Sequence, residues 1–392
     1  MLELNRRIAQ LEPSKSVTLM AKIKAMKKTD DSIINLTGGE PDFATPWKIC
    51  EEAAVQMKSG FTHYTDGPGI EPLRIALAEK LQKENHAPYQ PEQILVTPGA
   101  KYAVYLAVQA VLNPGDEAMW LAPGWVSYPS IIASTGGVPV AVHLKWEEQY
   151  RITLEALEEK VTEKTRLLII NYPNNPTGKV LSQKDREALK EFLQRHPKIV
   201  LLSDEIYEDI IYPGFEVVSM ASEPELFERV IVVNGFSKAY AMTGWRLGYL
   251  ACCDEIFRVV MKLFQHTISC TSGFLQKAAC VALTCKEETE RMRQQYEKRR
   301  NLLLLGIREL PGVEMLQPEG AFYAWLRFDV SVDSETLCEM LLEQAKIAGV
   351  PGIAYGETEQ VCVRFSYAAS EKELRQMLKN LEDFLPKLQQ TQ

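Results

Sequence analysis

Seven short apolar runs recur through the middle of the chain, separated by longer stretches in which apolar and charged residues follow a helical spacing. The runs are "QILVTPGA", "EAMWLAPG", "GVPVAVHL", "RLLIINYPNNPTG", "KIVLLSDEIY", "RVIVVNGFSK" and "LGYLACC". Several are near-continuous Val, Ile and Leu, which is typical of strands covered on both faces of a parallel sheet. "SQKDREALKEFLQRH" has helical spacing. The pattern predicts an α/β fold whose large domain holds a mostly parallel seven-stranded sheet covered by helices.

The pattern changes from about residue 285. "CKEETERMRQQYEKRRNLLLLGIREL" reads as a long charged amphipathic helix that ends at Pro311 and Gly312. The short strands "GAFYAWLRF" and "CVRFSYA" follow, flanked by amphipathic helices. We therefore expect a smaller α+β domain built from both ends of the chain. The expected boundaries are 1–45 for the N-terminal arm and part of the small domain, 46–288 for the large domain, and 289–392 for the small C-terminal domain.

Composition narrows the classes of protein that fit this pattern. A chain of 392 residues usually forms two domains. The formal net charge of −8 argues against nucleic acid or an anionic membrane as the main partner. The eight cysteines form no CxxC pair and most lie in apolar runs, which favours reduced thiols over a disulfide framework or a metal site. With no signal-peptide pattern and no apolar run long enough to span a membrane, we expect a cytoplasmic protein.

Polar and small residues stand where several of the predicted strands end. In open α/β sheets the ligand site lies beyond the carboxyl ends of the strands. If the sheet forms as predicted, the residues that converge there are Gly99, Ala100, Lys101, Trp125, Asn175, Asp204, Tyr207 and Lys238.

Lys238 lies in "NGFSKAYAMTGWRLGY", among glycines, small residues and aromatics. A free lysine has a pKa near ~10.4 and is a poor nucleophile at neutral pH. Burial and a neighbouring cation lower that pKa, and the neutral amine can then form a Schiff base with an aldehyde. Arg246 is a candidate for that cation, and its planar fork can also hold a phosphate. Alone, such a lysine would more often be a solvated loop residue.

Other strand ends allow both a structural and a functional interpretation. Asp204 can cap the next turn, or it can pair with a protonated pyridine nitrogen. The turn at Gly99 and Ala100 opens a helix, where backbone N–H groups can bind phosphate, although it lacks the dinucleotide and Walker patterns. Trp125 can stack on a flat ring or pack in the core. Asn175 lies in a proline-rich turn that can hold its amide rigidly.

Taken together, these stretches resemble the class I pyridoxal-phosphate aminotransferases, of fold type I in the aspartate aminotransferase superfamily. "LTGGEPDF", "TPGAK", "GWVSYP", "NYPNNPTG", "SDEIYE", "GFSKAYAMTGWRLG", "GAFY" and "VRFSYA" occur in the order found in that family. They extend from about residue 36 to residue 367. The resemblance implies the two-domain fold described above, and it is closest to the bacterial aspartate aminotransferase subgroup.

The resemblance implies pyridoxal 5′-phosphate as cofactor and gives roles to the residues around its ring. Lys238 would be its covalent attachment point, and Asp204 would pair with the ring nitrogen. Asn175 and Tyr207 would hydrogen-bond the O3′ oxygen of the ring. Trp125 would stack on the ring face.

The phosphate of the cofactor would be held by Arg246 and by the backbone amides of Ala100 and Lys101. Relatives often place a serine three residues before the lysine as a further phosphate ligand. That position is Gly235 here, so the contact is absent or moves to Ser237.

The resemblance also implies contacts to substrate and to a second subunit. Arg364 would bind the α-carboxylate of the substrate bidentately, with the backbone of Gly39 beside it. Trp125 and Asn175 would also contact the substrate. Tyr64 resembles the tyrosine that reaches the phosphate of the neighbouring subunit, which implies a homodimer with shared active sites. No metal and no nucleic-acid or membrane partner is expected.

The implied reaction is a ping-pong transamination between an amino acid and a 2-oxo acid. Lys238, freed when the amino acid binds, would move the α-proton as general base and acid. For a dicarboxylate substrate, Lys101 is the candidate for the distal carboxylate, and Lys15 in the N-terminal segment is a second candidate. L-Aspartate and 2-oxoglutarate are therefore the expected pair. Aromatic amino acids, alanine and prephenate remain alternatives.

Two further alternatives change the activity and keep the fold. A C–S β-lyase would use the same residues on a cysteine conjugate, and would release pyruvate without need of an oxo acid. A non-enzymatic regulator on this fold would carry an added DNA-binding domain, which the acidic charge and the roughly 35 residues before the family match disfavour.

Overall fold

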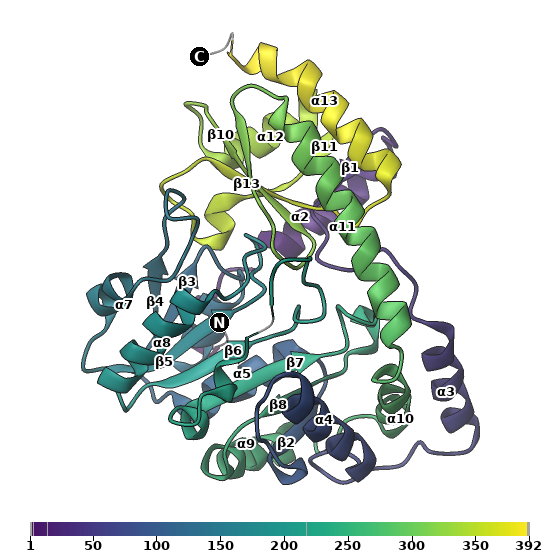
Figure 1. The fold of residues 1–392 in the computed structure, drawn as a ribbon, viewed down its shortest axis with the longest axis vertical. Helices are drawn as coiled ribbons and strands as arrows, with labels where there is room; N and C mark the ends of the chain where they lie inside the picture. The colour runs from purple at the N-terminus through teal and green to yellow at the C-terminus, as the bar shows by residue number, and fades with distance from the viewer. Residues whose placement is uncertain (1, 3, 14, 217, 390–392) are drawn as a thin grey trace.

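The computed structural model describes residues 2, 4–13, 15–216 and 218–389, which form a large region below and a smaller region above in Figure 1. The large region is built on a seven-stranded sheet in the order β2-β8-β7-β6-β5-β3-β4. Its strands are β2 (Ile94–Thr97), β3 (Glu117–Ala122), β4 (Val138–His143), β5 (Thr165–Asn171), β6 (Val200–Asp204), β7 (Val230–Gly235) and β8 (Gly248–Ala251). All neighbours are parallel except the two pairs that β8 forms. The seven predicted strands and the mostly parallel sheet are confirmed.

Helices cover both faces of this sheet, as the near-continuous apolar strands require. On one face Leu202 and Ile231 pack against α5 (Ala100–Val111), α6 (Tyr128–Thr135) and α9 (Asp254–Thr267). On the other face pack α3 (Trp47–Lys58), α4 (Glu71–Glu84), α7 (Leu154–Lys160), α8 (Gln183–Arg195) and α10 (Gly273–Ala282). Burial of each large apolar side chain stabilises the fold by about 1.5–3 kcal/mol.

The smaller region is a four-stranded sheet in the order β12-β13-β10-β9. Its strands are β9 (Val313–Leu316), β10 (Tyr323–Phe328), β12 (Val350–Pro351) and β13 (Cys362–Ser366). Three helices accompany it, namely α11 (Lys286–Arg308), α12 (Ser334–Gln344) and α13 (Glu371–Gln389). The long charged helix and both predicted strands are therefore confirmed.

The N-terminal segment packs with the C-terminal part of the chain. It contains α1 (Arg6–Ala9), α2 (Lys15–Lys27) and β1 (Ile34–Asn35), and β1 pairs in parallel with β11 (Ile347–Ala348). Short 3₁₀ turns complete the fold at η1 (Pro91–Gln93), η2 (Met220–Ser222), η3 (Phe227–Arg229), η4 (Thr243–Trp245) and η5 (Gly352–Tyr355). The domain boundaries expected from the sequence remain a prediction.

Ion pairs tie the small region to the N-terminal segment and to the large region. On the helix side, Arg299 of α11 binds both carboxylate oxygens of Asp42, at 2.7 and 2.8 Å. On the strand side, Glu319 accepts hydrogen bonds from the Nζ of Lys179 at 2.9 Å and from Arg151 at 2.6 Å. Glu319 precedes β10, so the bond from Lys179 fixes that strand against the loop after β5, and the bond from Arg151 fixes it against the segment before α7.

Two further properties of the chain concern its cysteines and its helices. Each of the eight cysteines carries a free thiol. Over the described ranges, the helices are either too short or too polar to cross a lipid bilayer.

Candidate active site

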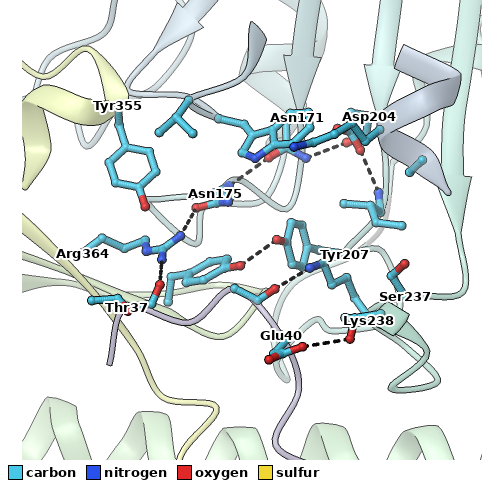
Figure 2. Close-up of a pocket in the computed structure, with 18 of the residues that line it drawn as sticks. Thr37, Glu40, Asn171, Asn175, Asp204, Tyr207, Ser237, Lys238, Tyr355 and Arg364 are labelled. Carbon is cyan, nitrogen blue, oxygen red and sulfur yellow. Dashed lines mark hydrogen bonds between the residues drawn. The ribbon is translucent and has the colours of Figure 1, made fainter. Parts of the chain in front are cut away.

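A cavity of about 390 Å³ opens between the carboxyl ends of β5, β6 and β7 and the facing strand β13. This volume falls within the range of small-molecule sites. Eleven of the residues singled out from the sequence line it: Gly39, Ala100, Lys101, Trp125, Asn175, Asp204, Tyr207, Ser237, Lys238, Arg246 and Arg364. Figure 2 shows how the side chains from the two regions face one another.

Lys238 follows β7, and its amine lies inside the cavity, where it donates a hydrogen bond to the backbone oxygen of Gly39 at 2.5 Å. Its Nζ also lies 5.6 Å from the centre of the Tyr207 ring. Burial, with help from the Arg364 guanidinium, lowers the pKa of this amine to about 8. A substantial fraction of the amine is therefore neutral near physiological pH, which is what a nucleophilic or proton-transferring lysine needs.

Asp204 is the last residue of β6, and its carboxylate is fully enclosed. The Tyr128 hydroxyl donates to it at 2.7 Å and the Ile206 backbone amide at 3.3 Å. Burial raises the pKa of Asp204 to about 6, although both hydrogen bonds oppose the shift. Within the described ranges no cationic side chain hydrogen-bonds this carboxylate. A buried carboxylate without a cationic partner is suited to bind a ligand that carries a cationic ring nitrogen.

Features typical of an anion site occur where β2 turns into α5. Gly99 has φ +87°, and a Cβ there would lie 2.5 Å from a terminal nitrogen of Arg246, so only glycine permits this approach. Ala100 begins α5, whose first backbone N–H groups have no partner inside the helix. An arginine fork beside a helix N-terminus binds a phosphate well. Ser237, which is buried, adds a hydroxyl to the cavity wall.

Gly235, where relatives often have serine, allows no side chain. An added Cβ would lie 2.8 Å from the Cα of Gly248 on the paired strand β8. A side-chain contact to phosphate from this position is therefore excluded by the packing of β7 against β8, while Ser237 lines the cavity.

Arg364 of β13 forms the opposite wall of the cavity. One terminal nitrogen donates to Asn175 Oδ1 at 3.1 Å and the other to the Thr37 backbone oxygen at 2.6 Å. Its guanidinium carbon lies 4.5 Å from the Tyr323 ring centre and 5.2 Å from that of Tyr355. A guanidinium held in this way is oriented for bidentate binding of a carboxylate.

Trp125 and Lys101 lie next to each other in the cavity wall. The Nζ of Lys101 is 4.9 Å from the centre of the Trp125 ring, which itself packs edge-on against Tyr128 at 5.2 Å. Burial, with a smaller contribution from Arg246, lowers the pKa of Lys101. Among the described residues no carboxylate forms an ion pair with Lys101, so its charge is available to a ligand.

The structure does not test two of the predicted site residues. Tyr64 is 91% exposed on the surface and does not line it. Lys15 begins α2, but its side chain lies outside the described residues. Neither position tests the predicted role, because the first role needs a second subunit and the second needs a described side chain.

The sequence reasoning missed several residues of the site. Thr37, Glu40, Tyr323 and Tyr355 line the cavity, and Tyr128 holds Asp204. Tyr128 and Tyr323 occur within the quoted stretches "GWVSYP" and "GAFY", so the signal for them was present. Tyr355 lies in "GIAYGE", which carries no recognisable pattern.

Comparison with known proteins places these residues in context. Residues 31–381 match the model of the family described as "Aminotransferase class I and II". A Petunia hybrida protein named bifunctional aspartate aminotransferase and glutamate/aspartate-prephenate aminotransferase is 39% identical over 98% of this chain and 83% of its own. The aromatic-amino-acid aminotransferase 2 of Thermococcus litoralis is 38% identical over 98% of each chain. The solved Thermus thermophilus aspartate aminotransferase with maleate superposes with a TM-score of 0.93, at 38% identity, over 98% of this chain and 100% of that one.

Proposed function

The chain belongs to the aminotransferase class I and II family, and from that premise we propose that it moves the amino group of L-aspartate to 2-oxoglutarate. It is an enzyme of the amino-group transferase class and catalyses transamination. The observation that carries the choice of substrate is the Lys101 ammonium group, which lies without a carboxylate partner among the described residues in the same cavity as Arg364. A dicarboxylate needs two cations, and this cavity offers them.

Membership of the family implies that the enzyme uses pyridoxal 5′-phosphate, and the cavity has features that fit this group. The Gly99 turn brings Arg246 beside the start of α5, which suits a phosphate. Asp204 is a buried carboxylate that only neutral donors contact among the described residues, which suits a protonated ring nitrogen. Lys238 offers an amine of lowered pKa in the same space. When bound, the cofactor holds the substrate nitrogen covalently and accommodates the negative charge that develops on the substrate Cα.

Within this assignment the residues of the chain have separate tasks. Lys238 takes the proton from the substrate Cα and returns a proton to complete the transfer, and a pKa near 8 lets it do both near neutral pH. Asp204 keeps the ring nitrogen protonated, because the two opposite charges stabilise each other in a buried site. Tyr207 and Asn175 orient the ring, and Trp125 limits its movement on one face.

Substrate recognition is assigned to Arg364 and Lys101, two of the cationic side chains that line the cavity. Arg364 binds the α-carboxylate, and its bonds to Asn175 and Thr37 hold the fork in place. Lys101 binds the distal carboxylate of aspartate. Gly39, whose backbone oxygen accepts a hydrogen bond from Lys238, lies beside the α-carboxylate position.

The substrate assignment is tested by a panel of amino donors with the Lys101→Met variant. For L-aspartate we expect KM to rise about 10- to 100-fold, because the variant loses a charge-assisted hydrogen bond worth about 1.5–3 kcal/mol. L-Alanine, which has no distal carboxylate, should keep its KM within about twofold. An unchanged KM for aspartate in the variant would overturn the assignment. A wild-type enzyme that prefers aromatic amino donors, or prephenate as the amino acceptor, would also overturn it. Release of pyruvate from a cysteine conjugate without any oxo acid would instead reveal β-lyase activity.

We also propose that the enzyme acts in the cytoplasm as a homodimer with shared active sites. The free thiols support a reducing compartment, and the exposure of Tyr64 leaves its ring available to a second subunit. The test mixes two inactive variants, Tyr64→Ala and Lys238→Ala. If each cavity uses the Tyr64 of the partner, mixed dimers regain one intact site and activity returns. No recovery in dimers that exchange subunits would contradict the proposal.

A further inference from the structure

The Tyr355 hydroxyl is a buried polar group that points into the cavity. Its side chain is 1% exposed, and the hydroxyl has no hydrogen-bond partner among the described residues. Figure 2 shows this oxygen directed toward the pair formed by Arg364 and Asn175. A buried hydroxyl without a partner costs about 1–3 kcal/mol, so a folded chain rarely retains one unless something else meets it.

The ring of Tyr355 is held firmly in this orientation. The Trp325 ring meets it edge-on at 5.8 Å and 89°, and the Trp325 Nε1 donates to the Tyr150 hydroxyl at 3.1 Å. Tyr150 in turn donates to Glu357 at 2.5 Å. The backbone oxygen of Tyr355 accepts from the Gly124 amide at 3.0 Å, which ties the ring to the loop that carries Trp125. A hydroxyl on such a support is preorganised for a ligand.

A second unpartnered donor belongs to the same wall. The Nε of Arg364 is buried without a hydrogen-bond partner in the described structure, while both terminal nitrogens of that side chain are engaged. The Arg364 guanidinium carbon lies 5.2 Å from the Tyr355 ring. Burial raises the pKa of Tyr355, so its hydroxyl keeps its proton and acts as a donor. Two donors with no acceptor of their own indicate an oxyanion as their shared ligand.

Other buried tyrosines show why this one is different. Tyr207 and Tyr323 also line the cavity, but their hydroxyls bond to each other at 2.7 Å. Tyr296 has an unpartnered buried hydroxyl too, yet it does not line the cavity and packs instead against Phe43 and Phe322. Tyr355 alone among these four combines an unpartnered hydroxyl with a place in the cavity wall.

We propose that the Tyr355 hydroxyl donates a hydrogen bond to the substrate α-carboxylate alongside Arg364, and so contributes to selection of α-amino and 2-oxo acids. The inference rests on the proposed function, in which Arg364 binds that carboxylate. The contact is present before and during the reaction, so it lowers KM and leaves kcat unchanged. It also serves every substrate of the enzyme, because all of them carry the same α-carboxylate.

The experiment compares Tyr355→Phe with Tyr296→Phe in the holoenzyme. Both variants remove one buried, unpartnered hydroxyl and keep the ring, so Tyr296→Phe is the matched control. We expect Tyr355→Phe to raise KM about 10-fold or more for aspartate and alanine alike, with kcat within about twofold, because a hydrogen bond to a charged group is lost. The Kd of succinate, an unreactive dicarboxylate, should rise by a similar factor. Tyr296→Phe should leave all of these constants unchanged.

Three results would overturn the proposal. The first is an unchanged KM and succinate Kd in Tyr355→Phe. The second is an equal rise in both variants, which would indicate general loosening of the small region. The third is a rise confined to aspartate, which would place the contact at the distal carboxylate. If the wild-type enzyme transaminates no amino acid, the proposed function fails, but the ratio of succinate Kd values between variant and wild type still tests Tyr355.

Discussion

Two largely buried lysines of this molecule differ in their charged partners. Lys80 of α4 donates to Asn85 at 2.7 Å and forms an ion pair with Glu208, and its side chain is only 11% exposed. Lys238 donates to a backbone oxygen, and its charged neighbours are Arg364, Glu40, Asp204 and Arg246. Lys80 forms an ion pair with a carboxylate, whereas Lys238 forms no such pair among the described residues and has charges of both signs nearby.

The electrostatic result differs accordingly. Burial alone would lower the pKa of Lys80, but the carboxylates of Glu208 and Asp209 outweigh burial and raise it. Burial and the nearby Arg364 lower the pKa of Lys238 to about 8. A lysine in a buried ion pair remains charged, and removing one partner of the pair destabilises the fold. A lysine without such a partner can be neutral and can react as a nucleophile or base. The comparison therefore separates a structural lysine from a reactive one on physical grounds.

The largest effect is expected from Lys238→Ala. Loss of the amine should reduce kcat/KM by at least about 10⁴-fold, or more than about 5 kcal/mol of transition-state stabilisation, because both proton transfers depend on it. Steady-state kinetics measures this effect, and thermal unfolding checks that the fold is intact. If the variant retained more than a hundredth of the wild-type activity, Lys238 would not be the reactive lysine.

Lys80→Met should act on stability and spare the chemistry. Removal of the cation leaves Glu208 buried without its ion pair, which costs about 3–5 kcal/mol. Urea unfolding should show this loss, while kcat of the folded enzyme stays within about twofold. The double variant Lys80→Met with Glu208→Gln should recover part of the stability. A loss of kcat with no loss of stability would show that Lys80 serves the reaction.

A similar contrast exists between the adjacent carboxylates Asp204 and Glu205. Both are buried, but Glu205 accepts from the hydroxyls of Ser203 and Ser219 and does not line the cavity. We expect Asp204→Asn to lower kcat about 10²- to 10³-fold, the usual cost of losing one buried electrostatic contact to the transition state. Glu205→Gln should leave kcat within about threefold. Equal losses of kcat in the two variants would contradict the assignment of Asp204.

The smallest effect is a pH dependence of stability. In the folded, cofactor-free protein the pKa of Lys238 is about 8, whereas in the unfolded chain it has the ordinary value of 10.5. Between these two pH values the folded protein binds fewer protons at this lysine than the unfolded chain does. The contribution of Lys238 to the free energy of unfolding therefore rises across this window. Lys238→Met should therefore be more stable than the wild type at pH 7, and this advantage should shrink toward pH 10. Paired melting curves at several pH values give the difference. An advantage that grows with pH would mean that the lysine pKa is raised.

The hydrophobic pattern predicted the fold well because strands and helices are local in sequence. All seven strands of the large sheet and α11 lie where the apolar periodicity indicated. The motifs that follow the strands also predicted most of the cavity, because parallel strands bring their carboxyl ends to one edge.

What the sequence could not show depends on contacts between distant residues. Lys80 is 128 positions from Glu208, so nothing near it marks it as paired. The orientation of Tyr355 depends on Trp325 and Tyr150, which belong to other elements. The packing that forces Gly235 to be glycine arises only when β7 and β8 pair. The role proposed for Tyr64 involves a second chain, so the structure of one chain does not test it.

The most direct test is the visible absorption spectrum of the holoenzyme before and after L-aspartate is added without any oxo acid. The account predicts that the cofactor band converts to that of the aminated cofactor and that 2-oxoglutarate restores it, whereas Lys238→Ala undergoes neither change. A wild-type band that no amino acid in a broad panel alters, or a Lys238→Ala protein that behaves like the wild type, would contradict the central claim for this lysine.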